Sequence, residues 1–144
     1  MKKVLVINGP NINLLGLREP EIYGSKTYKE LLIFIDKAAE EAEIDVHCFQ
    51  SNSEAAIIDE VQNAYCIYDG IIINPAAYTH TSIAIADAIK AVGIPAVEVH
   101  LSDLSKREAY RQISYVREVC CATISGKGFE GYSEAINVLK NVKK

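Results

Sequence analysis

Residues 70–82 read Gly-Ile-Ile-Ile-Asn-Pro-Ala-Ala-Tyr-Thr-His-Thr-Ser, so an apolar run leads directly into a polar turn. The run Ile71-Ile72-Ile73 is typical of a strand buried on both faces, as in parallel sheets covered by helices. The turn that follows carries the Asn74 amide and the His80 imidazole. Because open α/β sheets bind ligands beyond the carboxyl ends of their strands, this junction predicts a parallel sheet with a small-molecule site.

On either side of this junction, strand-like and helix-like segments alternate along the chain. Strands are predicted at residues 3–8, 45–49, 70–73, 96–100 and 119–125. Helices are predicted at 27–42, which a capping box of Thr27 and Glu30 opens, and after a second capping box formed by Ser51 and Glu54. Further helices are predicted at 81–91, 106–110 and 131–142. Five strands alternating with helices need crossover connections, which make the sheet parallel. For 144 residues this predicts one α/β domain, residues 1–144, with a flavodoxin-like three-layer sandwich and strand order 2-1-3-4-5.

The composition is that of an ordinary globular protein. Hydrophobic residues make up 49% of the chain, and the net charge of −4 gives no support for a nucleic-acid partner. Charged residues and glycines interrupt every apolar run, so neither a membrane span nor a signal peptide is predicted. The four cysteines show no metal-binding or CxxC spacing. They are expected to be reduced, mostly buried thiols of a cytoplasmic protein: Cys48, Cys66, Cys120 and Cys121.

Residues 9–26 form a long segment punctuated by glycine and proline. Such loops inside a compact domain are usually functional, and this one is predicted to be a lid over the site. It carries Arg18 and Tyr23. A phenol with a pKa near 10 is a poor base, but a neighbouring guanidinium would lower that pKa. The pair is therefore a candidate for catalysis, and the alternative is an ordinary surface tyrosine.

Two other predicted strand ends are also polar, Asn8-Gly-Pro-Asn-Ile-Asn and Glu98-Val-His-Leu-Ser-Asp. Glu98 and His100 are two residues apart on one strand, so their side chains point to the same side of the sheet. A carboxylate beside an imidazole orients it and supports its protonated form, which suits general acid catalysis. The alternative is a buried structural pair, and for His80 the alternative is a hydrogen bond to the loop backbone.

The remaining polar residues suit recognition of hydroxyl and carboxylate groups. Arg107 and Arg111 are four residues apart and would share one face of the short predicted helix, where with Ser102 they could clamp a carboxylate. Exposed arginines that only solvate a helix are the alternative. Neutral amides would recognise hydroxyls or stabilise an enolate-like oxygen. They stand at Asn8, Asn11, Asn13 and Asn74.

Several motifs in order resemble those of type II 3-dehydroquinate dehydratase. The resemblance runs from Val4 to about Leu139. Its motifs are Asn8-Gly-Pro-Asn-Ile-Asn-Leu-Leu-Gly, Arg18-Glu-Pro with Tyr23-Gly24, Gln50-Ser-Asn-Ser-Glu, Asn74 with Thr79-His80-Thr81-Ser82, Glu98-Val-His-Leu-Ser, Arg107 with Arg111, and Gly128-Phe-Glu-Gly-Tyr.

The resemblance implies a reaction and an assembly. The family, which belongs to the shikimate and quinate pathways, has the flavodoxin-like fold and forms dodecamers built from trimers. It uses no metal and no cofactor. It converts 3-dehydroquinate to 3-dehydroshikimate by anti elimination of water through an enolate.

The resemblance also implies residue roles. Tyr23 would take the C2 proton, Arg18 would activate it, and Asn11 would help hold a water that stabilises the enolate. His100, oriented by Glu98, would protonate the departing C1 hydroxyl. The substrate would be bound by Asn74, His80, Leu101, Ser102, Arg107 and Arg111. Asp87 would also bind substrate, but in the site of a neighbouring subunit.

The sequence departs from the family pattern at a few positions. Ala76-Ala77 stand where the family usually has glycine, Ala86 replaces a frequent arginine, and Asp103 replaces an asparagine. A non-catalytic flavodoxin-like module is the competing hypothesis. A receiver domain would place acidic groups after the first and third strands, where this chain has Asn8 and Asn74. A flavin carrier would need a Ser/Thr/Gly-rich phosphate loop after the first strand.

Overall fold

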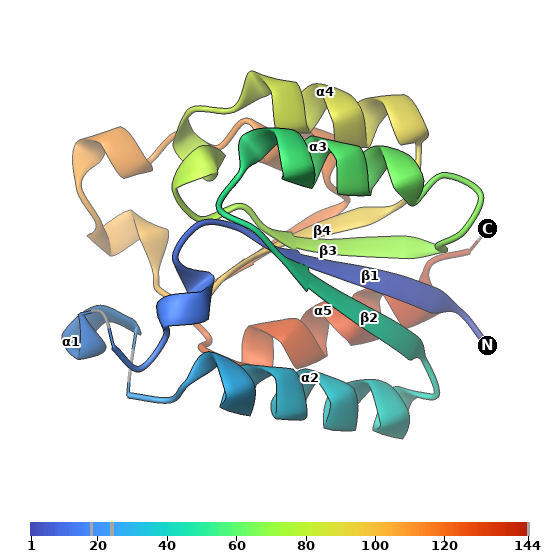
Figure 1. Cartoon of the computed structure of the whole chain (residues 1–144), viewed down its shortest axis with the longest axis horizontal. Helices are drawn as coiled ribbons and strands as arrows, with labels where there is room; N and C mark the ends of the chain where they lie inside the picture. Colours follow the sequence, from blue (N-terminus) through green and yellow to red (C-terminus); the bar gives the residue numbers. More distant parts are fainter. Residues whose placement is uncertain (18, 24, 144) are drawn as a thin grey trace.

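A computed structural model describes residues 1–17, 19–23 and 25–143, with only the backbone described at Tyr23. Five parallel strands form one sheet in the order β2-β1-β3-β4-β5, which confirms the predicted topology (Figure 1). The strands are β1 (Lys3–Asn8), β2 (Asp45–Gln50), β3 (Gly70–Asn74), β4 (Ala96–His100) and β5 (Ala122–Ser125). No helix among the described residues is long and apolar enough to cross a membrane.

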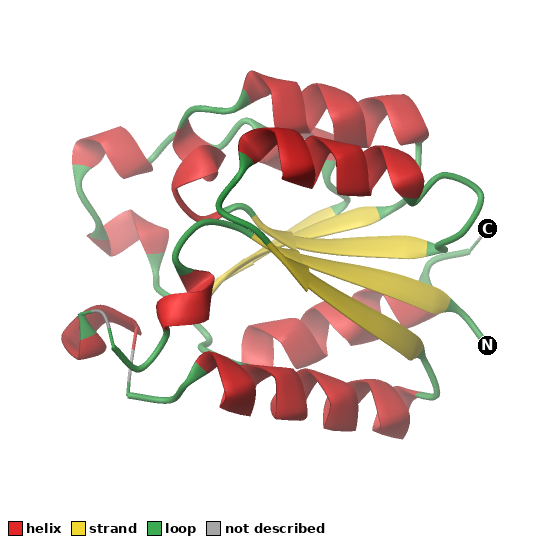
Figure 2. Ribbon diagram, viewed as in Figure 1, coloured by secondary structure: helices red, strands yellow, loops and turns green. Residues whose placement is uncertain are grey.

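Helices cover both faces of the sheet (Figure 2). Helices α2 (Tyr28–Ala42) and α5 (Glu130–Asn141) lie on one face, and α3 (Glu54–Asn63) and α4 (Ile83–Val92) lie on the other (Figure 1). Strand β1 shows how the sequence builds both layers. Val4 and Val6 belong to the core under α2 and α5, whereas Leu5 and Ile7 belong to the core under α3 and α4. Alternate residues of a central strand face opposite sides, so a continuous apolar run is what two covered faces require.

The helix starts confirm one predicted cap and correct another. Thr27 caps α2, and its hydroxyl accepts from the Glu30 amide at 3.2 Å, as the capping box predicts. Helix α3, however, is capped by Ser53, whose hydroxyl accepts from Ala56 N at 3.2 Å. The prediction of Ser51 as the cap was wrong because two serines stand two residues apart, and Ser51 instead accepts from the Ser53 amide at 3.0 Å.

Three other segments differ from the sequence-based expectation. The predicted helix at 106–110 is two separate 3₁₀ turns, Leu104–Lys106 and Ala109–Arg111. The strand predicted at 119–125 begins only at Ala122, because a 3₁₀ turn occupies Val116–Val119. Within residues 9–26 the structure has a 3₁₀ turn at Ile12–Leu14 and a short helix α1 at Pro20–Tyr23.

The four cysteines are free, but they are less buried than expected. Cys48 and Cys120 are half-buried, and burial raises the pKa of each thiol to about 12. Cys66 and Cys121 are exposed, so the prediction of mostly buried thiols was wrong for these two.

Candidate active site

A cavity of about 150 Å³ opens at the carboxyl edge of the sheet. The loops after β1, β3 and β4 all contribute to its walls, as the polar strand ends predicted. Eight of the predicted site residues line it: Asn11, Asn74, His80, His100, Leu101, Ser102, Arg107 and Arg111. The other lining residues, which were not predicted as site residues, are Pro10, Ile12, Ala76, Ala77 and Leu104.

The switch point between β1 and β3 adjoins the cavity, which Pro10 and Asn74 line. Gly9 N donates to Asn74 O at 2.8 Å, which joins the two strand ends. A Cβ atom at Gly9 would lie 2.5 Å from the backbone oxygen of Pro75, so no side chain fits there. Glycine is therefore required at this position by the close approach of two backbones.

A buried hydrogen-bond chain holds the two strand-end amides. The Tyr132 hydroxyl donates to Asn8 Oδ1 at 2.6 Å and accepts from Asn74 Nδ2 at 3.2 Å. Asn74 Oδ1 then accepts from the Ala76 amide at 3.1 Å. Asn74 is thus fixed by α5 beneath it and by its own loop. Tyr132, which ends the Gly128-Phe-Glu-Gly-Tyr motif, is a supporting residue for which no role in the site was predicted.

Ala76, one of the two alanines that depart from the resembled pattern, has a left-handed backbone with φ of 54°. This geometry suits glycine and strains alanine, because Cβ approaches the neighbouring carbonyl. The loop therefore holds alanine in a conformation that favours glycine, and this strained alanine is part of the cavity wall.

We expect Ala76→Gly to raise the free energy of unfolding by roughly 0.5–1 kcal/mol, because relief of left-handed strain exceeds glycine's greater entropy when unfolded. Ala77, in the same 3₁₀ turn without a positive φ, is the matched control. Ala77→Gly should lower that free energy by roughly 0.5–1 kcal/mol. Urea unfolding monitored by circular dichroism measures both. Equal losses in the two variants would contradict the assignment of strain.

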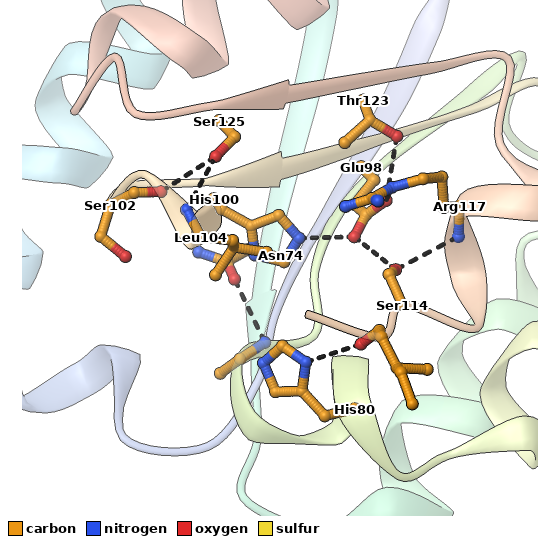
Figure 3. Close-up of polar contacts among 12 residues, drawn as sticks. Asn74, His80, Glu98, His100, Ser102, Leu104, Ser114, Arg117, Thr123 and Ser125 are labelled. Atoms are coloured by element: carbon orange, nitrogen blue, oxygen red, sulfur yellow. Dashed lines mark hydrogen bonds and ion pairs between the residues drawn. The ribbon is translucent and has the colours of Figure 1, made fainter. Parts of the chain in front are cut away.

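Glu98 and His100 face the same side and pair, as the two-residue spacing predicts, and both side chains are buried. The distance from His100 Nε2 to Glu98 Oε2 is 2.5 Å, and the two side chains are 5% and 0% exposed (Figure 3). Burial raises the pKa of the Glu98 carboxyl, but hydrogen bonding to His100 and the charge of that ring outweigh it, so the pKa is lowered. Glu98 is therefore ionised, and Nε2 of His100 must be the donor in their contact.

His80 stands across the cavity from this pair and contacts loop backbone. Its Nδ1 lies 2.7 Å from Ile113 O, which is the hydrogen bond to loop backbone expected as the alternative for this residue (Figure 3). Burial lowers the pKa of His80, and the charge of Arg111 adds to this effect. A neutral imidazole with Nδ1 donating to the carbonyl leaves Nε2 as an acceptor, which suits binding of a substrate hydroxyl.

The two arginines meet at the cavity, although not on one helix as their spacing suggested. Arg107 follows the first 3₁₀ turn and Arg111 ends the second. Arg107 Nη1 donates to the Ser102 hydroxyl at 3.3 Å, which confirms the predicted neighbourhood. Glu108 lies between them, with its Oε2 2.9 Å from Arg111 Nε and 3.6 Å from Arg107 Nε. The result is a basic wall that suits a carboxylate ligand.

Three predicted residues stand apart from this set. Asp87 is exposed on α4 and is not among the described residues that line the cavity. Arg18 lies outside the described residues, and so does the side chain of Tyr23, whose backbone ends α1. The suggested pairing of Tyr23 with Arg18 stays a prediction.

Three partners of Glu98 were not predicted: Ser114, Arg117 and Thr123. Thr123 could have been inferred, because it pairs with Glu98 in the register of β4 and β5. Ser114 and Arg117 come from irregular segments for which the sequence gives no spatial signal.

Comparison with known proteins gives a consistent result. The family described as "Dehydroquinase class II" matches residues 2–140. The chain belongs to the class II dehydroquinase family.

Individual class II relatives cover nearly the full chain. The 3-dehydroquinate dehydratase of Clostridium perfringens is 55% identical over 140 residues, covering 96% of this chain and 97% of the relative. That of Geotalea daltonii is 48% identical and covers 99% of both. The crystal structure of the type II dehydroquinase from Butyrivibrio crossotus has a TM-score of 0.95 and 48% identity, covering 97% of this chain and 98% of the other.

Proposed function

We propose that this class II dehydroquinase is a hydro-lyase that converts 3-dehydroquinate to 3-dehydroshikimate in the shikimate pathway. Support comes from the family and its named relatives. The structural observation that carries the proposal is the buried Glu98–His100 pair facing a cavity whose other wall holds Arg107 and Arg111. An acid opposite a carboxylate-binding wall suits a substrate whose leaving hydroxyl and carboxylate share one carbon.

The proposed chemistry has two proton transfers. Tyr23, activated by Arg18, removes the C2 proton, and the bonding electrons move onto the C3 ketone oxygen to give an enolate. A water held with Asn11 hydrogen-bonds to this oxygen. The electrons then return, the C1–O bond breaks, and His100 donates a proton to the departing hydroxyl, which leaves as water. Acid and base act on opposite faces, so the elimination is anti.

The proposed binding contacts follow the cavity lining. Arg107, together with Ser102 and the Leu101 backbone, would hold the carboxylate. Asn74, His80 and Arg111 would bind the ring hydroxyls. Each of these residues lines the cavity.

This mechanism forms an enolate and no imine, so no lysine should form a covalent adduct. No lysine is among the described residues that line the cavity, and Lys127 is paired with Glu134 at 2.6 Å. We expect borohydride added with substrate to leave both activity and protein mass unchanged. A reduced adduct in the mass spectrum would refute the enolate route, and a reduced peptide would identify the lysine.

We further propose a trimer-based dodecamer in the cytoplasm, with each site completed by Asp87 of a neighbouring subunit. Asp87 is exposed on α4 and is not among the described residues that line the cavity of its own subunit. This position supports a role across a subunit contact.

We expect Asp87→Ala to reduce kcat/KM by about tenfold or more while leaving circular dichroism unchanged, since an exposed carboxylate contributes little to folding. Asp59→Ala is the control, because Asp59 is likewise exposed on a helix, α3. Steady-state assays would compare the activity of the two variants with that of the parent protein. Light scattering would give the oligomeric state of the parent protein. A fully active monomer at assay concentration would refute the shared site and return Asp87 to an ordinary surface role.

A further inference from the structure

The Glu98 carboxylate is surrounded by donors beyond His100 (Figure 3). Oε2 accepts from His100 Nε2 at 2.5 Å and from the Ser114 hydroxyl at 2.6 Å. Oε1 accepts from the Thr123 hydroxyl at 3.0 Å, and Arg117 Nε lies 3.8 Å from it. The donors come from β4, β5, the 3₁₀ turn at Val116–Val119 and the loop before that turn.

This arrangement matches the capacity of an ionised carboxylate. Two carboxylate oxygens offer about four lone-pair positions. Hydrogen bonds from His100, Ser114 and Thr123 occupy three of them, and Arg117 adds a positive charge 3.8 Å from Oε1. A fully buried charge is tolerated only where such donors replace water. Removing a donor would therefore weaken the ionised form of Glu98 relative to its protonated form.

We propose that Thr123 and Ser114 are positioning residues that set the acid strength of His100 by keeping Glu98 ionised and correctly oriented. This inference rests on the proposed role of His100 as the acid. Ionised Glu98 accepts the Nε2 proton of His100, which leaves Nδ1 to exchange a proton at the cavity. The same negative charge stabilises the imidazolium from which the proton is donated.

The fold fixes the hydroxyls of Thr123 and Ser114 beside the two oxygens of Glu98. Thr123 is the direct partner of Glu98 in the register of β4 and β5, so the sheet itself fixes the Oε1 contact. Ser114 is held by its neighbours in the loop. Ile113 O contacts His80 Nδ1 at 2.7 Å, and Tyr115 N donates to Thr79 O at 3.2 Å. The loop is thus anchored to the turn after β3 on both sides of Ser114.

Other titratable groups around the pair do not replace these hydroxyls. Burial, together with the negative charge of Glu98, raises the pKa of Cys120 to about 12, so its thiol is neutral. His80, with its lowered pKa, is also neutral near pH 7. Arg111 and Arg117 stay charged at any working pH. The effect of their positive charges on Glu98 and His100 is unchanged when the Thr123 hydroxyl is removed.

The test compares Thr123→Val, which removes the hydroxyl with little change of shape, with Thr123→Ser, which keeps it. Nuclear magnetic resonance of ¹⁵N-labelled imidazole gives the pKa of His100 in the free protein, and steady-state assays give kcat against pH. We expect the valine variant to lower the His100 pKa by about one unit and kcat about tenfold, with KM within about twofold. The serine variant should stay close to the parent on both measures.

Ser114→Ala, which removes a donor from the other oxygen, is the second variant if Thr123→Val fails to fold. A hydroxyl that only stabilised the fold would change the melting temperature but leave the His100 pKa and the pH profile in place, and that result would overturn the proposal. The imidazole titration needs no substrate. A shifted His100 pKa in a protein inactive on 3-dehydroquinate would refute the proposed function while supporting the positioning role.

Discussion

Tyr23→Phe should reduce kcat for 3-dehydroquinate dehydration by roughly 10²–10⁴-fold while KM changes little. The phenol oxygen is proposed to act only on the C2 proton, so its loss removes an interaction made chiefly in the transition state. Exchange of the C2 proton with deuterated solvent should fall in parallel, because that exchange needs the same base. Steady-state kinetics and proton nuclear magnetic resonance of the substrate measure the two effects.

Tyr65→Phe is the control for this change, since Tyr65 is 62% exposed and lies just after α3, away from the cavity. It should behave as the parent enzyme does. A Tyr23→Phe variant with near-normal turnover would exclude Tyr23 as the base and leave the lid without its proposed catalytic group.

His100→Gln should separate the two proton transfers. The glutamine amide keeps a donor for the buried Glu98 carboxylate but has no transferable proton of suitable acidity. We therefore expect loss of water to slow by roughly 10²–10⁴-fold while C2 proton exchange is partly retained. Exchange faster than product formation would indicate an enolate that forms and returns without expelling the hydroxyl.

The matched control is His47→Gln, because the His47 side chain is 54% exposed on β2 and lies outside the cavity. If exchange and dehydration fell together with substrate affinity in His100→Gln, His100 would be a binding residue. Melting temperatures of both variants would show whether the Glu98 environment survives the substitution.

The sequence predicted the fold because its periodic signals are strong. The run Ile71-Ile72-Ile73 and the five strand–helix alternations leave few arrangements of a parallel sheet, and the observed strand order is the predicted one. The Glu98–His100 contact was also predictable, since two-residue spacing on a strand fixes which side both residues face.

Sequence reasoning failed where backbone conformation is irregular. The spacing of Arg107 and Arg111 suggested one helix, yet two 3₁₀ turns bring them together by another route. Ser114 and Arg117 come from the same region, where no periodic pattern reports position. At Ala76 the sequence showed a departure from the resembled pattern but not that the backbone there is left-handed.

Ultraviolet absorbance during incubation with 3-dehydroquinate tests the central claim most directly, because only the dehydrated product contains a conjugated enone. We predict an increase in absorbance that scales with enzyme concentration, persists after treatment with a metal chelator, and reaches the end point expected for 3-dehydroshikimate. A protein with intact circular dichroism that produces no enone, or that carries bound flavin absorbance instead, would contradict the account and favour a non-catalytic flavodoxin-like module.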